Sequence, residues 1–255
     1  MVDDGYAVYA LEHRGHGRSA GPRALIDRID HAVADLDSMV ALASGEHPQA
    51  PVFLLGHSMG GTLALAYALR HQDRLDGLAL SGPLAAIEAA APPMRIASKV
   101  LSALAPRLPL ISIDASLISR DPRVVQAYVE DPLVHHGKLP ARTVAELADA
   151  IERFPGAVAA ITVPTLIMYG TLDGLCPPRG SLMLYERIGA RDKTLIPYEG
   201  LYHEIFNEPE RERVLDDLCS WLARHLESRG GLRGAAGHDV ERPVVEDEDA
   251  PMREH

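Results

Sequence analysis

The stretch from Pro51 to Arg70 constrains the fold most strongly, because it combines a strand, a sharp turn and a helix. Its four apolar residues Val52–Leu55 predict a short buried strand. Residues 56–60 then read Gly-His-Ser-Met-Gly, a G-x-S-x-G spacing, and Thr62–Arg70 is rich in Ala and Leu, which favour a helix. The serine of such a turn stands on a strained backbone with its hydroxyl clear of the main chain. A glycine-rich turn with an unremarkable surface serine is the alternative, and the flanking strand and helix argue against it.

The composition excludes several other classes of protein. The 255 residues are 47% hydrophobic and 24% charged, which is typical of a globular chain with one large core. A net charge of −11 argues against a nucleic-acid partner, since phosphate binding needs a basic face. Two cysteines, no long apolar run and no secretory signature predict a cytoplasmic protein in a reducing compartment. No metal-ligand spacing is present, so neither a metal nor a cofactor is expected.

Strand-like and helix-like segments alternate along most of the chain. Strands are expected at Tyr6–Leu11, Val52–Leu55, Leu75–Leu80, Thr165–Tyr169 and Lys193–Ile196, and further helices at Ile26–Ser44, Ser181–Ile188 and Arg211–Leu226. This alternation predicts the α/β class, with a mostly parallel sheet covered by helices on both faces.

Residues 84–160 break this rhythm, because they contain many prolines and no obvious core strand. We interpret this block as a helical cap lying over the strand ends, the alternative being a second helical layer away from any site. The predicted organisation is therefore a core of residues 1–83 and 161–228, a cap of residues 84–160, and a disordered acidic tail of residues 229–255.

Three side chains suited to nucleophilic catalysis follow three different strands. A serine nucleophile needs a base to take its proton and a carboxylate to orient that base. Ser58 follows the strand Val52–Leu55, Asp173 follows Thr165–Tyr169, and His203 follows Lys193–Ile196. Ligands and catalytic groups collect at the carboxyl ends of parallel strands, and the order Ser, Asp, His is that of α/β-hydrolases. The sequence therefore predicts a catalytic triad.

Each partner of the serine has a competing interpretation. Asp173 precedes a glycine and could be a turn residue, while Asp192 and Glu199 are rival acids. His203 is one of 12 histidines. Among the others, His57 adjoins the serine, where a structural hydrogen bond is the simpler role.

Four residues near the predicted triad are assigned supporting roles. The amide of Met59, at the start of the following helix, is expected to stabilise an oxyanion. His57, Leu175 and Cys176 are expected to border the substrate. Because Cys176 comes three residues after Asp173, a bulky thiol reagent bound to it should inhibit the enzyme.

Six segments together resemble the monoacylglycerol lipase (serine aminopeptidase S33, lysophospholipase-like) family of α/β-hydrolases, in particular its actinobacterial members. They are residues 10–19, 56–61, 119–122, 131–137, 170–177 and 198–209, and the resemblance runs from about residue 5 to 227. It implies that Ser58 is the nucleophile, that Asp173 orients His203, and that His203 is general base and then acid. It further implies a lipid-facing cap and cleavage of monoacylglycerol or a similar single-chain lipid ester; a lysophospholipase or a general carboxylesterase is the alternative. Glu12 replaces the Asp usual in the first turn.

The start of the chain departs from this family. Members begin with further strands and with a His-Gly loop that supplies the second oxyanion donor, so about 50 residues are expected to be missing. The absent third strand would lie between Tyr6–Leu11 and Val52–Leu55, leaving both without a shared neighbour. Either the protein is longer than this chain, which we favour, or the chain is a catalytically impaired, hydrolase-like lipid-binding protein.

An apolar cluster in the cap suggests a second contact. It consists of Leu101, Leu104, Leu108, Leu110 and Ile111. The cluster would suit a transient, peripheral contact with a membrane surface, and ordinary packing onto the core is the equally weighted alternative.

Overall fold

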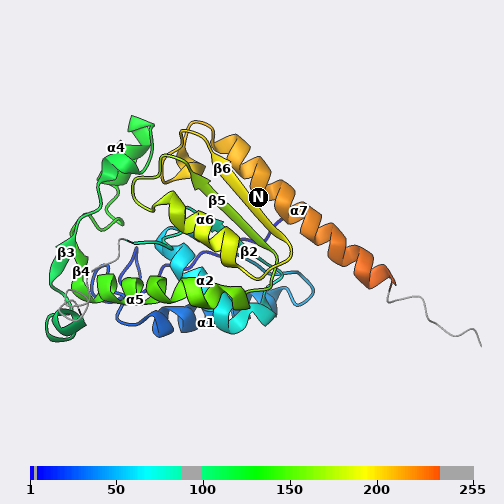
Figure 1. Cartoon of the computed structure of the whole chain (residues 1–255), viewed down its shortest axis with the longest axis horizontal. Helices are drawn as coiled ribbons and strands as arrows, with labels where there is room; N and C mark the ends of the chain where they lie inside the picture. Colours follow the sequence, from blue (N-terminus) through cyan, green and yellow to red (C-terminus); the bar gives the residue numbers. More distant parts are fainter. Residues whose placement is uncertain (3–4, 88–98, 236–255) are drawn as a thin grey trace, which may run out of the picture.

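The computed structural model of the chain describes residues 1–2, 5–87 and 99–235. At its centre is a four-stranded parallel sheet with the strand order β1-β2-β5-β6 (Figure 1). The strands are β1 Phe53–His57, β2 Gly77–Ser81, β5 Thr165–Gly170 and β6 Lys193–Tyr198, with a separate antiparallel pair of β3 Pro109–Ile111 and β4 Leu139–Pro140. The α-helices include α1 Ile29–Glu46, α2 Met59–His71, α4 Pro122–Glu130, α5 Ala141–Ala157, α6 Pro178–Arg187 and α7 Arg211–Ala235, and residues 99–104 are helical as well. The short 3-10 helices are η2 Gln72–Arg74, η3 Ala115–Leu117, η4 Val158–Ala160 and η5 Ile205–Asn207. The predicted α/β class with a parallel sheet is confirmed.

Helices cover both faces of this sheet, and the alternation of side chains along each strand explains how. In β2, Leu78 and Leu80 belong to a core cluster shared with α1, α2, α5 and α6. Ala79, between them, points to the opposite face and belongs to a second cluster with Trp221 of α7. Figure 1 shows α1, α2 and α5 together on one side of the sheet and α7 on the other. The sheet is therefore buried on both faces, as its continuous apolar strands predict.

The predicted strand Tyr6–Leu11 is wrong. These residues form no ladder with any described residue, and β1 is hydrogen-bonded to β2 alone. The Tyr6 side chain packs against the α7-side cluster, whereas Val8 is 57% exposed. A continuous apolar run indicates which side chains can be buried, but a strand also needs a neighbouring strand whose backbone pairs with it. Within the described residues no strand pairs with this segment, and the Tyr6 amide donates to the Met1 carbonyl oxygen at 3.2 Å.

Within residues 84–160, two groups of elements behave differently. The pair β3 and β4 and the helix α4 lie at one end of the molecule (left in Figure 1). Helix α5 instead packs against α2, α1 and α6, because its buried residues Leu147, Ile151 and Phe154 recur at helical spacing. Although the prediction placed it in the cap, α5 belongs to the helical layer of the core.

Part of the predicted cap and part of the predicted tail lie outside the described residues. Residues 88–98 of the predicted cap and residues 236–255 of the predicted tail are not among the described residues. Residues 229–235 continue α7 to Ala235, so the helix passes the predicted boundary at residue 228. None of the helices in the described part of the chain combines the length and apolar character needed to cross a bilayer.

Candidate active site

Ser58 lies at the junction of β1 and α2 in a backbone conformation that an L-residue rarely adopts. Its φ is 54° and its ψ is −121°. Two glycines permit close packing here, because Gly56 lets β1 approach α2 and Gly61 lets α2 approach the segment after β2. A Cβ at Gly56 would lie 2.5 Å from the Gly60 carbonyl oxygen, and one at Gly61 would lie 2.7 Å from Pro83 Cβ. A Cβ at Gly60 would meet nothing within 4 Å, so the close packing falls on Gly56 and Gly61.

Asp173 and His203 form a buried pair beyond the carboxyl ends of β5 and β6. His203 Nδ1 lies 2.8 Å from Asp173 Oδ2, and the two side chains are 5% and 0% exposed. The other carboxylate oxygen, Oδ1, accepts hydrogen bonds from the amides of Leu175 at 2.9 Å and Cys176 at 2.8 Å. Because an ionised carboxylate only accepts hydrogen bonds, Nδ1 carries the imidazole proton and Nε2 is left as the acceptor.

The backbone of Ser58 is tied to a segment that touches this pair. The Ser58 amide donates to the Ser81 carbonyl oxygen at 3.1 Å. Gly82, the next residue, has a φ of +46°, and a Cβ there would lie 3.1 Å from Asp173 Oδ2 and 3.3 Å from His203 Nδ1. Segment 81–82 therefore brings the serine and the Asp–His pair together.

The Ser58 hydroxyl is directed at Cys176. Its Oγ lies 3.6 Å from Cys176 Sγ. That sulfur, a carboxylate oxygen of Asp173 and a ring nitrogen of His203 all lie within 4.8 Å of one another. Among the described residues, the Ser58 hydroxyl makes this contact with the sulfur and no hydrogen bond to the His203 imidazole.

The Met59 amide is a candidate oxyanion donor. Met59 is the first residue of α2, where the amides of the first turn have no carbonyl partner within the helix. The Ser58 amide, in contrast, already donates to Ser81. A negative charge beside Met59 would also be stabilised by the positive end of the helix dipole.

His57 and Cys176 are both held in their neutral forms. His57 Nδ1 lies 2.9 Å from the Ser81 carbonyl oxygen, to which it donates, and its ring centroid is 4.6 Å from that of His203. Burial, and then the neighbouring His203, lower the pKa of His57 to about 4. Burial, and then the charge of Asp173, raise the pKa of the Cys176 thiol to about 12. Leu175, half-buried, adjoins Cys176 on the same loop.

The two rival acids lie elsewhere or are solvated. Asp192 immediately precedes β6, at the opposite end of that strand from His203, and pairs with His225 at 3.0 Å. Glu199 follows β6 but is exposed. Of the three acids that the sequence offered, only Asp173 contacts His203.

Sequence reasoning missed Glu208 and Arg120. The Glu208 carboxylate is buried and pairs with Arg120 Nε at 2.9 Å, next to the His203 loop. Both residues lie in segments that the family resemblance already included, but no local pattern marks them as partners.

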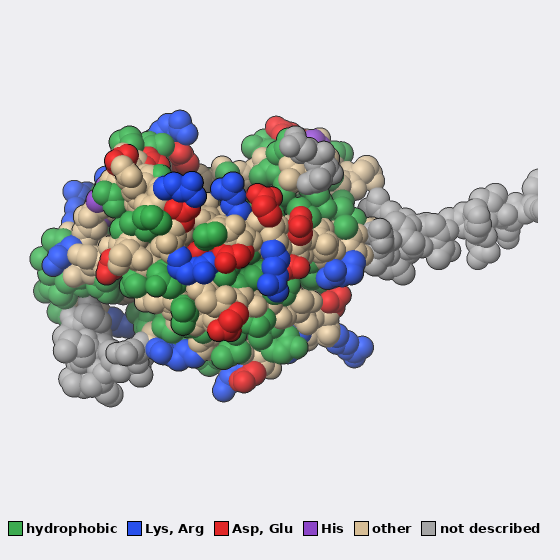
Figure 2. Space-filling model, turned by 90° about the horizontal axis from the view of Figure 1, so that it is seen from above, with side chains coloured by type: hydrophobic (Ala, Val, Ile, Leu, Met, Phe, Trp, Pro, Cys, Tyr) green, Lys and Arg blue, Asp and Glu red, His purple; other side chains and the backbone are tan. Residues whose placement is uncertain are grey.

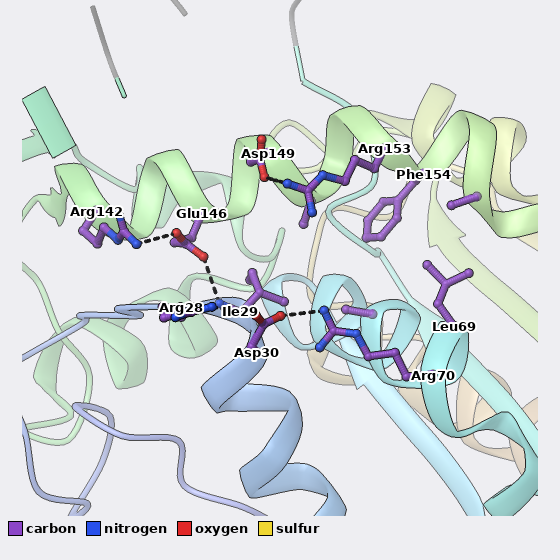
Figure 3. Close-up of a pocket in the computed structure, with 13 residues that line it drawn as sticks. Arg28, Ile29, Asp30, Leu69, Arg70, Arg142, Glu146, Asp149, Arg153 and Phe154 are labelled. Atoms are coloured by element: carbon purple, nitrogen blue, oxygen red, sulfur yellow. Dashed lines mark hydrogen bonds and ion pairs between the residues drawn. The ribbon is translucent and has the colours of Figure 1, made fainter. Parts of the chain in front are cut away.

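A groove lies away from these residues. It has a volume of about 330 Å³ between the start of α1, α2 and α5, and it is lined by charged side chains (Figure 3). Its arginines pair with its acids, as Arg70 does with Asp30 at 2.5 Å and Arg142 with Glu146 at 2.9 Å. Each of its four arginines pairs with one of its three acids, and none of its lining residues belongs to the site around Ser58.

The sheet, the elbow at Ser58 and the surrounding helices define an α/β-hydrolase. The chain matches the family model described as "Serine aminopeptidase, S33" over residues 1–210, and it belongs to that family.

Two curated relatives and two solved structures are particularly similar. The chain is 45% identical over 223 residues to the monoacylglycerol lipase of Mycolicibacterium smegmatis, covering 87% of this chain and 80% of that protein. It is 36% identical over 227 residues to the monoglyceride lipase of Homo sapiens, covering 88% and 75%. The structure of the Paleococcus ferrophilus monoacylglycerol lipase is similar with a TM-score of 0.74 and 34% identity, covering 84% and 81%. A soluble variant of monoglyceride lipase from Saccharomyces cerevisiae, in complex with a substrate analog, gives 0.73 and 26%, covering 84% and 76%.

Proposed function

We propose that this chain hydrolyses the ester bond of monoacylglycerol, or of a similar single-chain lipid ester, through an acyl-enzyme intermediate. The observation that carries the proposal is the left-handed serine of the elbow beside a buried Asp–His pair. Relatives named monoacylglycerol lipase, one of them 45% identical, support this choice of substrate class.

The proposed reaction assigns one step to each group. Ser58 Oγ attacks the ester carbonyl carbon while its proton passes to His203 Nε2, and Asp173 stabilises the imidazolium that forms. The carbonyl oxygen becomes an oxyanion and accepts a hydrogen bond from the Met59 amide. Collapse of this intermediate breaks the bond to glycerol, which leaves with the proton from Nε2. A water then attacks the acyl-serine ester, returns a proton through the same imidazole to Ser58 Oγ, and releases the fatty acid.

We further propose that residues 99–140 act as the cap that receives the acyl chain and touches the lipid surface. Leu104 is 81% exposed and Ile111 is 49% exposed. Figure 2 shows hydrophobic side chains at the end of the molecule that carries β3 and β4. Exposed apolar side chains of this kind favour contact with a lipid surface. Leu104→Glu is expected to slow hydrolysis of monoacylglycerol in vesicles without slowing hydrolysis of a water-soluble ester; equal effects on both would contradict a surface contact.

Replacement of the nucleophile tests the proposal. Ser58→Ala should abolish labelling by an active-site phosphonate and reduce the kcat for monoacylglycerol by about 10⁴-fold or more. Ser38→Ala, which changes an exposed serine on α1, serves as the control and should leave both unchanged. Labelling that persists in Ser58→Ala would reject the proposal. A kcat/KM higher for lysophospholipid or short soluble esters than for monoacylglycerol would replace the proposed substrate.

A further inference from the structure

Glu208 is a fully buried carboxylate that joins two segments far apart in the sequence. Its side chain is 0% exposed. Oε1 accepts hydrogen bonds from the backbone amides of Tyr202 at 2.9 Å and Arg120 at 3.1 Å, and Oε2 accepts one from Arg120 Nε at 2.9 Å. Arg120 also pairs with Glu210. A buried carboxylate is tolerated only when its oxygens are paired in this way, so the contact is specific.

A second hydrogen bond reaches the same loop from the same segment. The amide of Glu204 donates to the Ile118 carbonyl oxygen at 2.7 Å. His203 is therefore flanked by two tethered amides, that of Tyr202 through Glu208 and that of Glu204 directly. Both tethers lead to residues 118–121, which immediately precede α4 and which we call the cap base.

Leu117, which immediately precedes the cap base, contacts the loop that carries Asp173. A Cβ at Gly174, next to Asp173, would lie 3.2 Å from Leu117 Cδ2. Ile118 and Ser119 are themselves buried, at 2% and 3% exposure. A shift of the cap base would consequently move the backbone on either side of His203, and it would also displace the loop that carries Asp173.

We propose that Glu208 is a positioning residue that couples the cap base to His203, so that the cap and the general base move as one unit. The inference rests on the proposed role of His203 as general base. The Glu208 side chain contacts Tyr202 and Arg120 rather than the Ser58 hydroxyl or the imidazole, so it acts through the backbone on either side of the histidine. Loss of the link should therefore impair proton transfer more than substrate binding.

Glu208→Gln breaks one part of the link selectively. The amide oxygen can replace Oε1 and still accept from the two backbone amides, whereas the amide nitrogen then replaces Oε2 and opposes the Arg120 Nε–H, donor against donor. Arg120→Gln removes the donor from the other side. Each variant should lower kcat by about tenfold with KM within about twofold, because small misplacements of a catalytic group are costly. The kcat of the double variant should be no lower than that of the less active single variant, since both changes break the same contact.

Hydrogen exchange supplies a readout that does not depend on activity. The amides from Tyr202 to Asn207 should exchange faster in Glu208→Gln than in the wild type, because the loop has lost its attachment to the cap base.

Glu146→Gln is a matched control. Glu146 likewise joins a backbone amide, that of Ile29 at 3.0 Å, to an arginine, Arg142 at 2.9 Å, but it lies in the groove of Figure 3. This variant should lower the melting temperature and leave kcat unchanged. Wild-type kcat and wild-type exchange in both Glu208→Gln and Arg120→Gln, or an equal loss of kcat in Glu146→Gln, would overturn the coupling. If the wild type itself neither turns over nor labels at Ser58, the proposed function fails, and unchanged exchange in Glu208→Gln would separately overturn the link.

Discussion

Replacing Asp173 with Asn tests the Asp–His pair, because the change should move the imidazole proton of His203 from Nδ1 to Nε2. The two amides that point at Oδ1, from Leu175 and Cys176, leave only one workable orientation for the new side chain. Its carbonyl oxygen must face those two donors, so its NH₂ group faces His203 Nδ1. Nδ1 must then accept a hydrogen bond, and the imidazole proton moves to Nε2. The base can no longer take a proton from Ser58.

The expected size of this effect is large although the shape of the side chain hardly changes. The equivalent change in a serine protease of unrelated fold lowers kcat about 10⁴-fold through the same wrong tautomer. At about 1.4 kcal/mol per factor of ten, that corresponds to about 5 kcal/mol of lost transition-state stabilisation. Asp173→Asn should therefore show about 10⁻⁴ of the wild-type kcat for a soluble ester, and its labelling by a phosphonate should slow in parallel.

Asp192 provides a matched control for this experiment. Asp192→Asn alters an exposed Asp–His pair with His225, 3.0 Å apart, and should retain wild-type kcat. An Asp173→Asn variant with more than a tenth of the wild-type kcat would refute the tautomer argument, as would an equal loss in Asp192→Asn.

Three further predictions concern residues around this pair. Gly82→Ala should destabilise the fold by about 1–2 kcal/mol in thermal melting, since φ is +46° at this position. It should also lower kcat about tenfold in kinetic assays, since the new Cβ would lie 3.1 Å from Asp173 Oδ2. His57, with its pKa lowered to about 4 in the folded state against an ordinary 6.5, binds its proton more readily when unfolded. The free energy of unfolding should therefore fall by about 3 kcal/mol as the pH drops from 6.5 to 4, and urea titrations of His57→Gln should lose this dependence. Cys176 has a thiol pKa of about 12 and should therefore react with iodoacetamide at pH 7.5 about a thousandfold more slowly than a free cysteine, as measured by mass spectrometry. The modified protein should be inactive, because Cys176 Sγ lies 3.6 Å from the Ser58 hydroxyl. Full activity after complete modification would contradict the last prediction.

The elements that position the candidate site were predictable because their signals are local. The elbow follows from five residues, 56–60, between an apolar run and an Ala-rich run. The predicted strands Thr165–Tyr169 and Lys193–Ile196 correspond to β5 and β6, each one or two residues longer in the structure. Since parallel strands end at one edge of a sheet, the positions of Asp173 and His203 after two such strands predicted their contact at 2.8 Å, whereas the action of Ser58 with this pair stays a prediction.

What the sequence could not predict depends on partners distant along the chain. Tyr6–Leu11 is apolar like a buried strand but pairs with no strand in the described structure. Helix α5 looked like part of the cap because proline-rich segments surround it, yet its apolar stripe packs against α2. Arg120 and Glu208 are separated by 88 positions, and each resembles an ordinary charged residue beside a helix start. Only tertiary structure brings such residues together.

The left-handed backbone of Ser58 has a consequence for anyone who engineers this protein. A serine at a φ of 54° raises the free energy of the folded state by about 1–2 kcal/mol relative to a relaxed turn, and glycine at that position would remove most of the penalty. Under the proposed function, the most thermostable elbow is therefore an inactive one. Directed evolution that screens only for soluble, heat-resistant protein would select against Ser58, the proposed nucleophile, so each round needs a selection for turnover.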